Sequence, residues 1–323
     1  MARALTIVTY HYVRDAETSA FPRIKALPVA AFRRQLDAFE REFTIVDPQQ
    51  VLDAANGAEL PDGALLLTFD DGYADHYDTV FPLLTERGHR GVFFPATLPL
   101  AEGRVLDVNK IQFIVAAVAD HGALAQAVRE TVNAHRKDCG LAAAEVYWAR
   151  FSGASRYDGP ETAFVKRMLQ KGLPAPLRAQ LVDELFRRHV TTDEKSFAAA
   201  LYAGAGQLGE MRAAGMHIGC HGHAHRWLDT LDTGEQRRDI ETALGWLGQS
   251  GLIGERWMMC YPHGATDDRA AALLRSLGCA LAMTVAPARA DLDQDLMRLP
   301  RFDANDFAMN AAGKAAARSL PVN

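Results

Sequence analysis

The chain has 323 residues, of which 49% are hydrophobic and 23% are charged, an ordinary composition for a soluble globular protein. Its formal net charge of −5 provides no basic surface that would favour nucleic acid as a partner. No stretch reaches the roughly 18 apolar residues of a membrane-spanning helix. The first ten residues also lack the long apolar region of a signal peptide, so we expect a cytoplasmic protein without a membrane span.

Short apolar runs alternate with helical patterns along most of the chain. The runs that predict strands cover residues 5–10, 44–46, 64–69, 91–95, 216–220, 257–261 and 279–285. Apolar side chains recur at helical spacing from Val29 to Phe43, and a capping box of Thr233 and Gln236 predicts a helix that ends near Gln249. Repeated alternation of strands and helices is typical of a parallel sheet flanked by helices, either open or closed into a barrel.

This alternation is interrupted between about residues 101 and 210. The stretch is rich in alanine and charged residues, shows helical spacing of apolar side chains, and has little strand signal. We interpret it as a mostly helical insertion in one connection of a single domain that spans residues 1–323. Insertions in the connections that follow the carboxyl ends of barrel strands often cover the active site.

Two adjacent carboxylates, Asp70 and Asp71, follow the apolar run at 64–69 and precede a glycine. Like charges side by side at the edge of a buried core repel one another unless a cation or a shared proton relieves them. The pair could instead be an ordinary turn, because Asp-Gly is common turn chemistry. A second unusual element makes the functional interpretation the stronger one.

This element, His221-Gly222-His223-Ala224-His225, follows the apolar run at 216–220. Its first and last histidines are four residues apart, so on a helical turn they would face the same side and could share one ion. His223 would then point away from them. Carboxylate and imidazole groups form the ligand set of a zinc-type hydrolytic site. Because α/β folds place their chemistry at the carboxyl ends of strands, we infer that the carboxylates after the run at 64–69 converge with these histidines, although the sequence itself does not show it.

A third segment, Tyr261-Pro262-His263-Gly264, follows another predicted strand. The three segments, together with Thr68-Phe69 and Gly72-Tyr73 around the two aspartates, resemble in order and spacing the polysaccharide deacetylases of the NodB-homology type, carbohydrate esterase family 4. The resemblance covers roughly residues 5–100 and 215–303. It implies a distorted, incomplete (β/α) barrel of about seven parallel strands and hydrolysis of an N-acyl group on a sugar.

The resemblance also implies roles for individual residues. Asp70 looks like the general base, and Asp71, His221 and His225 look like the ligands of a divalent ion. Zinc is the default ion, with Co²⁺, Ni²⁺ or Mn²⁺ as alternatives. The backbone N–H of His263 would stabilise the oxyanion.

The chain departs from the family pattern in three places. Cys260 stands where an arginine often orients the base, His263 stands where an aromatic is usual, and the late motif that supplies an acid histidine has two arginines, Arg298 and Arg301. His263 and, less favoured, His223 are therefore the candidates for the general acid. We expect four further residues to line the substrate pocket: His11, Tyr261, Arg298 and Arg301. One of the two arginines could instead tether Asp70.

The predicted function is metal-dependent removal of an N-acyl group from a sugar, a nucleotide-sugar or a glycan precursor, with acetyl as the acyl group that the resemblance implies. Two alternatives remain open at this point. One is a metal-retaining carbohydrate-binding protein without turnover, which Cys260 and the missing late histidine motivate. The other is a hydrolase of esters or non-sugar amides on the same scaffold. The sequence predicts an N-acylated carbohydrate as partner and leaves the oligomeric state open.

Overall fold

A computed structural model describes residues 3–153, 158–309 and 315–317 of the chain. Contacts between residues divide it into two compact units. The barrel unit consists of Met1–Asp15, Lys25–Arg104 and Ala198–Asn323, and the helical unit consists of Ala16–Ile24 and Val105–Phe197.

All seven predicted strands form in the barrel unit. They are β1 (Ala4–Tyr10), β2 (Thr44–Ile45), β3 (Ala64–Asp71), β4 (Val92–Pro95), β5 (His217–Ile218), β6 (Trp257–Cys260) and β7 (Cys279–Met283). Four short strands that the sequence analysis did not predict are β8 (Ala290–Asp291), β9 (Phe302–Asp303), β10 (Phe307–Met309) and β11 (Ala315–Ala317). The predicted α/β fold is therefore confirmed.

The strands form a curved and incomplete barrel. In the main sheet β5, β4, β3 and β1 are neighbours in that order, all parallel, with β9 also parallel to β1. The parallel pair β6 and β7 forms a separate small sheet. Single parallel bridges join this pair to the main sheet on both sides, Cys220 with Met259 after β5 and Met283 with Leu299 before β9. All the parallel strands therefore direct their carboxyl ends to one rim.

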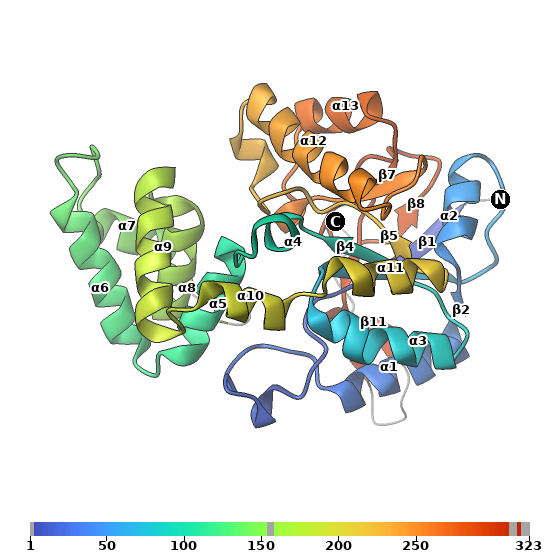
Figure 1. Cartoon of the computed structure of the whole chain (residues 1–323), viewed down its shortest axis with the longest axis horizontal. Coiled ribbons are helices and arrows are strands. Elements are labelled where there is room, and N and C mark those ends of the chain that lie inside the picture. The colour runs from blue at the N-terminus through green and yellow to red at the C-terminus, as the bar shows by residue number, and fades with distance from the viewer. Residues whose placement is uncertain (1–2, 154–157, 310–314, 318–323) are drawn as a thin grey trace. The chain divides into compact units, whose positions relative to one another are not determined.

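Helices of the barrel unit flank these strands (Figure 1). They are α1 (Val29–Glu42), α2 (Pro48–Ala55), α3 (Phe81–Glu86), α4 (Leu98–Glu102), α11 (Ala205–Ala213), α12 (Thr233–Gln249) and α13 (Asp268–Ser276). The cap of α12 differs from the prediction by one residue. Asp232 accepts a hydrogen bond from the Glu235 N–H at 2.7 Å and forms the capping box with Glu235, because an aspartate carboxylate is a strong cap.

The helical unit contains α5 (Asp107–Ala117), α6 (His121–Ala134), α7 (Ala144–Phe151), α8 (Pro160–Arg167) and α9 (Ala175–His189), and α10 (Glu194–Leu201) begins in it. No strand occurs among its described residues. At its centre the fully buried Lys110 forms ion pairs with Asp183 at 2.6 Å and Glu194 at 2.8 Å. A buried ammonium group needs such partners because its desolvation is otherwise too costly.

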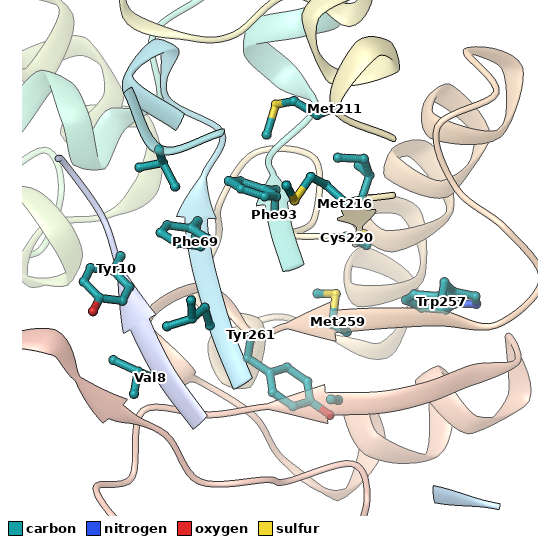
Figure 2. Close-up of a cluster of buried hydrophobic side chains, with 14 of the residues drawn as sticks. Val8, Tyr10, Phe69, Phe93, Met211, Met216, Cys220, Trp257, Met259 and Tyr261 are labelled. Atoms are coloured by element: carbon teal, nitrogen blue, oxygen red, sulfur yellow. The ribbon is translucent and has the colours of Figure 1, made fainter. Parts of the chain in front are cut away.

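The core of the barrel unit explains why β3 is apolar along most of its length. All eight residues of β3 are buried, as expected for a parallel strand that is covered on both faces. Phe69 on β3 stacks on Tyr10 of β1 and on Phe93 of β4, and Figure 2 shows these rings in the same cluster as Tyr261.

Among the described residues no helix is long and apolar enough to cross a membrane.

Candidate metal centre and catalytic site

Side chains from several strand ends meet at the carboxyl rim of the barrel. Asp70 and Asp71 are the last two residues of β3, and His221 and His225 lie in the loop after β5. His263 lies in the turn after β6. The topology of parallel strands thus brings together residues that are about 150 positions apart in the sequence.

Asp71, His221 and His225 form a compact group. Asp71 Oδ1 lies 3.3 Å from His221 Nε2 and 3.2 Å from His225 Nε2. One ligand atom from each of the three residues lies within 4.8 Å of the other two, which is close enough for one metal ion to bind all three. Asp71 and His221 are 3% and 2% exposed, so water does not screen this group.

Hydrogen bonds around the group fix which atoms face its centre. His221 Nδ1 lies 2.7 Å from the carbonyl oxygen of Cys260, which can only accept, so Nδ1 carries the proton and Nε2 offers a lone pair. The hydroxyl of Tyr73 donates to Asp71 Oδ2. Asp71 Oδ1 is buried and has no hydrogen-bond partner among the described residues. A carboxylate oxygen with a free lone pair and two imidazole nitrogens together form a donor set for a divalent transition metal. These residues therefore fit such an ion.

The electrostatics of the group also favour a positive charge. Burial alone would raise the pKa of Asp71, but the two imidazoles outweigh burial and hold that pKa well below its usual range. For His221 burial would lower the pKa, and the neighbouring Cys260 and Asp71 outweigh it and raise the pKa. A proton or a metal ion between the three side chains supplies the positive charge that both pKa shifts favour.

Backbone strain is concentrated at this site. Among the described residues three non-glycine residues have positive φ: Asp71 at 73°, His225 at 52° and His263 at 59°. Such conformations cost free energy and are rare outside functional sites. Gly72 has φ of 72°, and a Cβ there would lie 2.8 Å from Cβ of Pro95. Only glycine therefore fits directly after Asp71 at this close approach.

His221 and His225 do not share a helical turn. The segment is a loop without helical hydrogen bonds, and His225 reaches the same centre through its left-handed backbone conformation. His223 points elsewhere: its Nδ1 lies 2.9 Å from Thr97 Oγ1, and its Nε2 lies 3.5 Å from a Glu102 oxygen. These contacts disfavour His223 as the general acid.

Asp70 lies in a separate hydrogen-bond network beside the group of Asp71, His221 and His225. Arg301 donates to both of its oxygens, from Nη1 to Oδ1 at 2.9 Å and from Nη2 to Oδ2 at 2.7 Å. Thr9 and Cys260 also donate to Oδ2, at 3.1 Å and 3.3 Å. Burial would raise the pKa of Asp70, but the Arg301 guanidinium outweighs it and holds the pKa well below its usual value. The carboxylate is therefore ionised at neutral pH.

The two arginines of the late segment have different surroundings. Arg301 is 1% exposed and is held by Asp70, by Thr284 O at 2.9 Å and by Cys260 Sγ at 2.8 Å. It therefore tethers Asp70, and the alternative that it binds substrate is wrong because its guanidinium is already fully engaged. Arg298 is on the surface and forms ion pairs with Asp268 at 2.6 Å and Asp295 at 3.2 Å.

The prediction that Tyr261 lines the substrate pocket is also wrong. Its side chain is fully buried in the hydrophobic core (Figure 2). The thiol of the preceding residue, Cys260, contacts Asp70. Successive side chains of an extended backbone point to opposite faces, so Tyr261 points away from the site.

His263 and His11 are the two remaining imidazoles that the sequence analysis assigned to the site. The ring of His263 is stacked on Trp227 at 4.1 Å between centroids and meets the ring of His225 edge-on at 4.4 Å. Burial and the neighbouring His225 hold the pKa of His263 well below its usual range. His11 is exposed and lies directly after β1.

Two residues of the site were missed by the sequence analysis as functional residues. Tyr73 orients Asp71, and its only signal was its place two residues after the aspartate. Asp239, on α12, accepts hydrogen bonds from backbone N–H groups of the loop that carries the histidines. Its sequence position within a helix gave no signal, because buried acidic residues in helices are normally indistinguishable from surface ones.

Comparisons with known proteins agree with this geometry. A family model described as polysaccharide deacetylase matches residues 57–129 and 185–282, slightly more than half of the chain. The match includes Asp70, Asp71, His221, His225 and His263, and it takes in both ends of the stretch predicted as an insertion. A search of curated proteins found no match.

Several solved structures share the fold. The Streptococcus pyogenes deacetylase PplD in complex with acetate has a TM-score of 0.58 at 15% identity, covering 94% of this chain and 93% of that one. IcaB from Ammonifex degensii has a TM-score of 0.53 at 18% identity, covering 94% and 92%. The deacetylase domain of BpsB from Bordetella bronchiseptica has a TM-score of 0.52 at 16% identity, covering 93% and 96%.

Proposed function

This chain belongs to the polysaccharide deacetylase family, and we propose that it removes an N-acyl group from a sugar with a divalent ion held by Asp71, His221 and His225. Family membership makes it a hydrolase that deacetylates a carbohydrate. The proposal adds the metal dependence, zinc as the ion and a sugar nitrogen as the atom that carries the acyl group. The substrate class is a small acylated sugar, a nucleotide-sugar or a glycan precursor, and the cytoplasm stays the predicted location.

One observation carries the metal dependence. Asp71 Oδ1 is buried, lacks a hydrogen-bond partner among the described residues, and faces two imidazole nitrogens at 3.2 and 3.3 Å. An unpartnered carboxylate oxygen in a buried position costs free energy unless a cation binds to it. Three protein ligands leave further coordination positions open, as catalytic zinc sites require.

The ion, when bound, supplies a water molecule of lowered pKa and polarises the acyl carbonyl. Asp70 would accept the proton of the attacking water as general base. Its Oδ2 receives three donors, whereas Oδ1 receives only Arg301 Nη1 among the described residues, so Oδ1 is the oxygen that takes the proton. Arg301 keeps the carboxylate ionised and oriented for this step.

The leaving amine needs a proton, and the developing oxyanion needs a donor. We assign the oxyanion to the backbone N–H of His263, whose left-handed φ of 59° turns the peptide away from helical geometry. The lowered pKa of His263 keeps its imidazole neutral, so we favour the exposed His11 over His263 as the group that delivers the proton. The buried guanidinium of Arg301 replaces the arginine missing at Cys260, which weakens the case for a protein without turnover.

The reaction is tested by measuring release of amine and of acid from N-acetyl, N-formyl and O-acetyl sugars. We expect amine release from N-acetyl sugars by the zinc-loaded protein, loss of release after chelation, and recovery on adding zinc. His221→Ala serves as the control with a missing ligand. Release from O-acetyl sugars alone would make the protein an esterase, and no release from the whole panel would favour a binding protein.

A further inference from the structure

The loop of residues 221–225, here called the histidine loop, is held by its backbone from one side. The N–H of His221 donates to Pro95 O at 3.3 Å. The carbonyl oxygens of Gly222 and His223 accept from the N–H groups of Thr97 and Leu98, at 3.2 and 2.9 Å. The chain from the last residue of β4 to the first residue of α4 therefore holds one side of the loop.

The opposite, N–H side of the loop is held by one carboxylate from α12. Asp239 is 7% exposed. Its Oδ2 accepts from the His223 N–H at 2.9 Å, and its Oδ1 accepts from the Ala224 N–H at 3.2 Å. An ionised carboxylate makes stronger hydrogen bonds to N–H groups than a neutral acceptor does. Both bonds go to residues that lie between the two histidines of the metal group.

Gly222 shows how closely the carboxylate and the loop fit. Its φ is 72°, and a Cβ at this position would lie 2.6 Å from Asp239 Oδ2. Any side chain here would push the carboxylate away from the loop. The loop sequence is thus matched to Asp239 on the neighbouring helix.

The two histidines depend on this support to different degrees. His221 is oriented by its own ring, because Nδ1 donates to Cys260 O. His225 Nδ1 is buried and has no hydrogen-bond partner among the described residues. The orientation of the His225 ring therefore depends on its packing and on the left-handed backbone that leads into it, at φ of 52°.

We propose that Asp239 is a positioning residue of the metal centre, which sets the affinity for the ion by fixing the backbone that presents His225. This inference rests on the proposed metal-dependent function. Groups that orient metal ligands without touching the ion commonly change metal affinity tenfold to a hundredfold when they are replaced. Asparagine at position 239 keeps the size of the side chain but can accept from only one of the two N–H groups, because its NH₂ group is a donor.

The test compares zinc affinity in the full-length, metal-stripped protein by competition with a chromophoric chelator, together with the visible spectrum of the Co²⁺ form. We expect Asp239→Asn to raise the Kd for zinc tenfold to a hundredfold and to alter the Co²⁺ spectrum. Asp232→Asn is the matched control. It removes the same charge from the start of the same helix and keeps a good N-cap, so its Kd should equal that of the wild type.

An unchanged Kd in Asp239→Asn would overturn the inference, as would an equal rise in Asp232→Asn. Gly222→Ala provides a second variant if Asp239→Asn does not fold, and it should raise the Kd in the same direction by displacing the carboxylate. His221→Ala distinguishes failure of the metal centre from failure of the positioning role. If the wild type and His221→Ala have the same Kd for zinc, the proposed metal centre is wrong. If His221→Ala has a raised Kd but Asp239→Asn has the Kd of the wild type, only the positioning role of Asp239 is wrong.

Discussion

Replacement of Asp70 by asparagine is expected to lower the rate of deacetylation about 10²- to 10⁴-fold, the usual contribution of a general base. Asparagine has nearly the same shape but cannot accept the proton of the attacking water. Zinc content should stay at the wild-type level, because the group of Asp71, His221 and His225 does not include Asp70. Turnover and bound zinc are measured on the same sample.

This substitution also leaves the buried guanidinium of Arg301 without its counter-charge. The assay is therefore run at a temperature at which circular dichroism shows the variant to be folded. Wild-type turnover in a folded, zinc-loaded Asp70→Asn protein would refute the assignment of the base. Loss of zinc from this variant would mean that Asp70 is itself a ligand.

Replacement of Arg301 by methionine is expected to destabilise the fold by about 3–5 kcal/mol, the typical cost of removing one partner from a buried ion pair. The guanidinium is 1% exposed and bonds to both oxygens of Asp70, so the buried carboxylate would be left charged without its partner. Turnover should also fall, because the base loses the group that orients it. Chemical denaturation measures the first effect and steady-state kinetics the second.

Arg298→Met is the matched control for this experiment. Its side chain pairs with Asp268 and Asp295 at the surface, where such pairs contribute about 0–1 kcal/mol. The double variant with Asp70→Asn and Arg301→Met removes both buried charges, so it should be more stable than Arg301→Met while staying inactive. Equal stabilities for Arg301→Met and Arg298→Met would contradict the tether.

The fold was predictable because its strands are short apolar runs between turn and cap residues. The barrel strand β3 is the clearest case, since burial on both faces requires a continuous apolar sequence. The strands β8 and β9 have two residues each and depend on pairing with β1, which no local pattern can indicate. The spacing of four between His221 and His225 does not distinguish a helical turn from a loop, and only the structure shows that a left-handed residue brings His225 to the same centre.

Part of the candidate site was also predictable. The sequence indicated that Asp71, His221 and His225 would meet, and the structure brings them together, although their role as ligands stays a prediction. The sequence could not show whether Arg298 or Arg301 tethers Asp70. Only the path of the chain before β9 shows that the guanidinium of Arg301 is the one that is buried in the core. The supporting contacts of Tyr73 and Asp239 likewise depend on packing between elements.

The central claim is tested most directly by a crystal structure of the zinc-loaded protein with anomalous data collected at the zinc edge. The account predicts one strong anomalous peak between Asp71, His221 and His225. A second group of possible ligands lies next to it and consists of Asp70, His221 and Cys260. A peak at that second group, or no peak within reach of Asp71, would contradict the account.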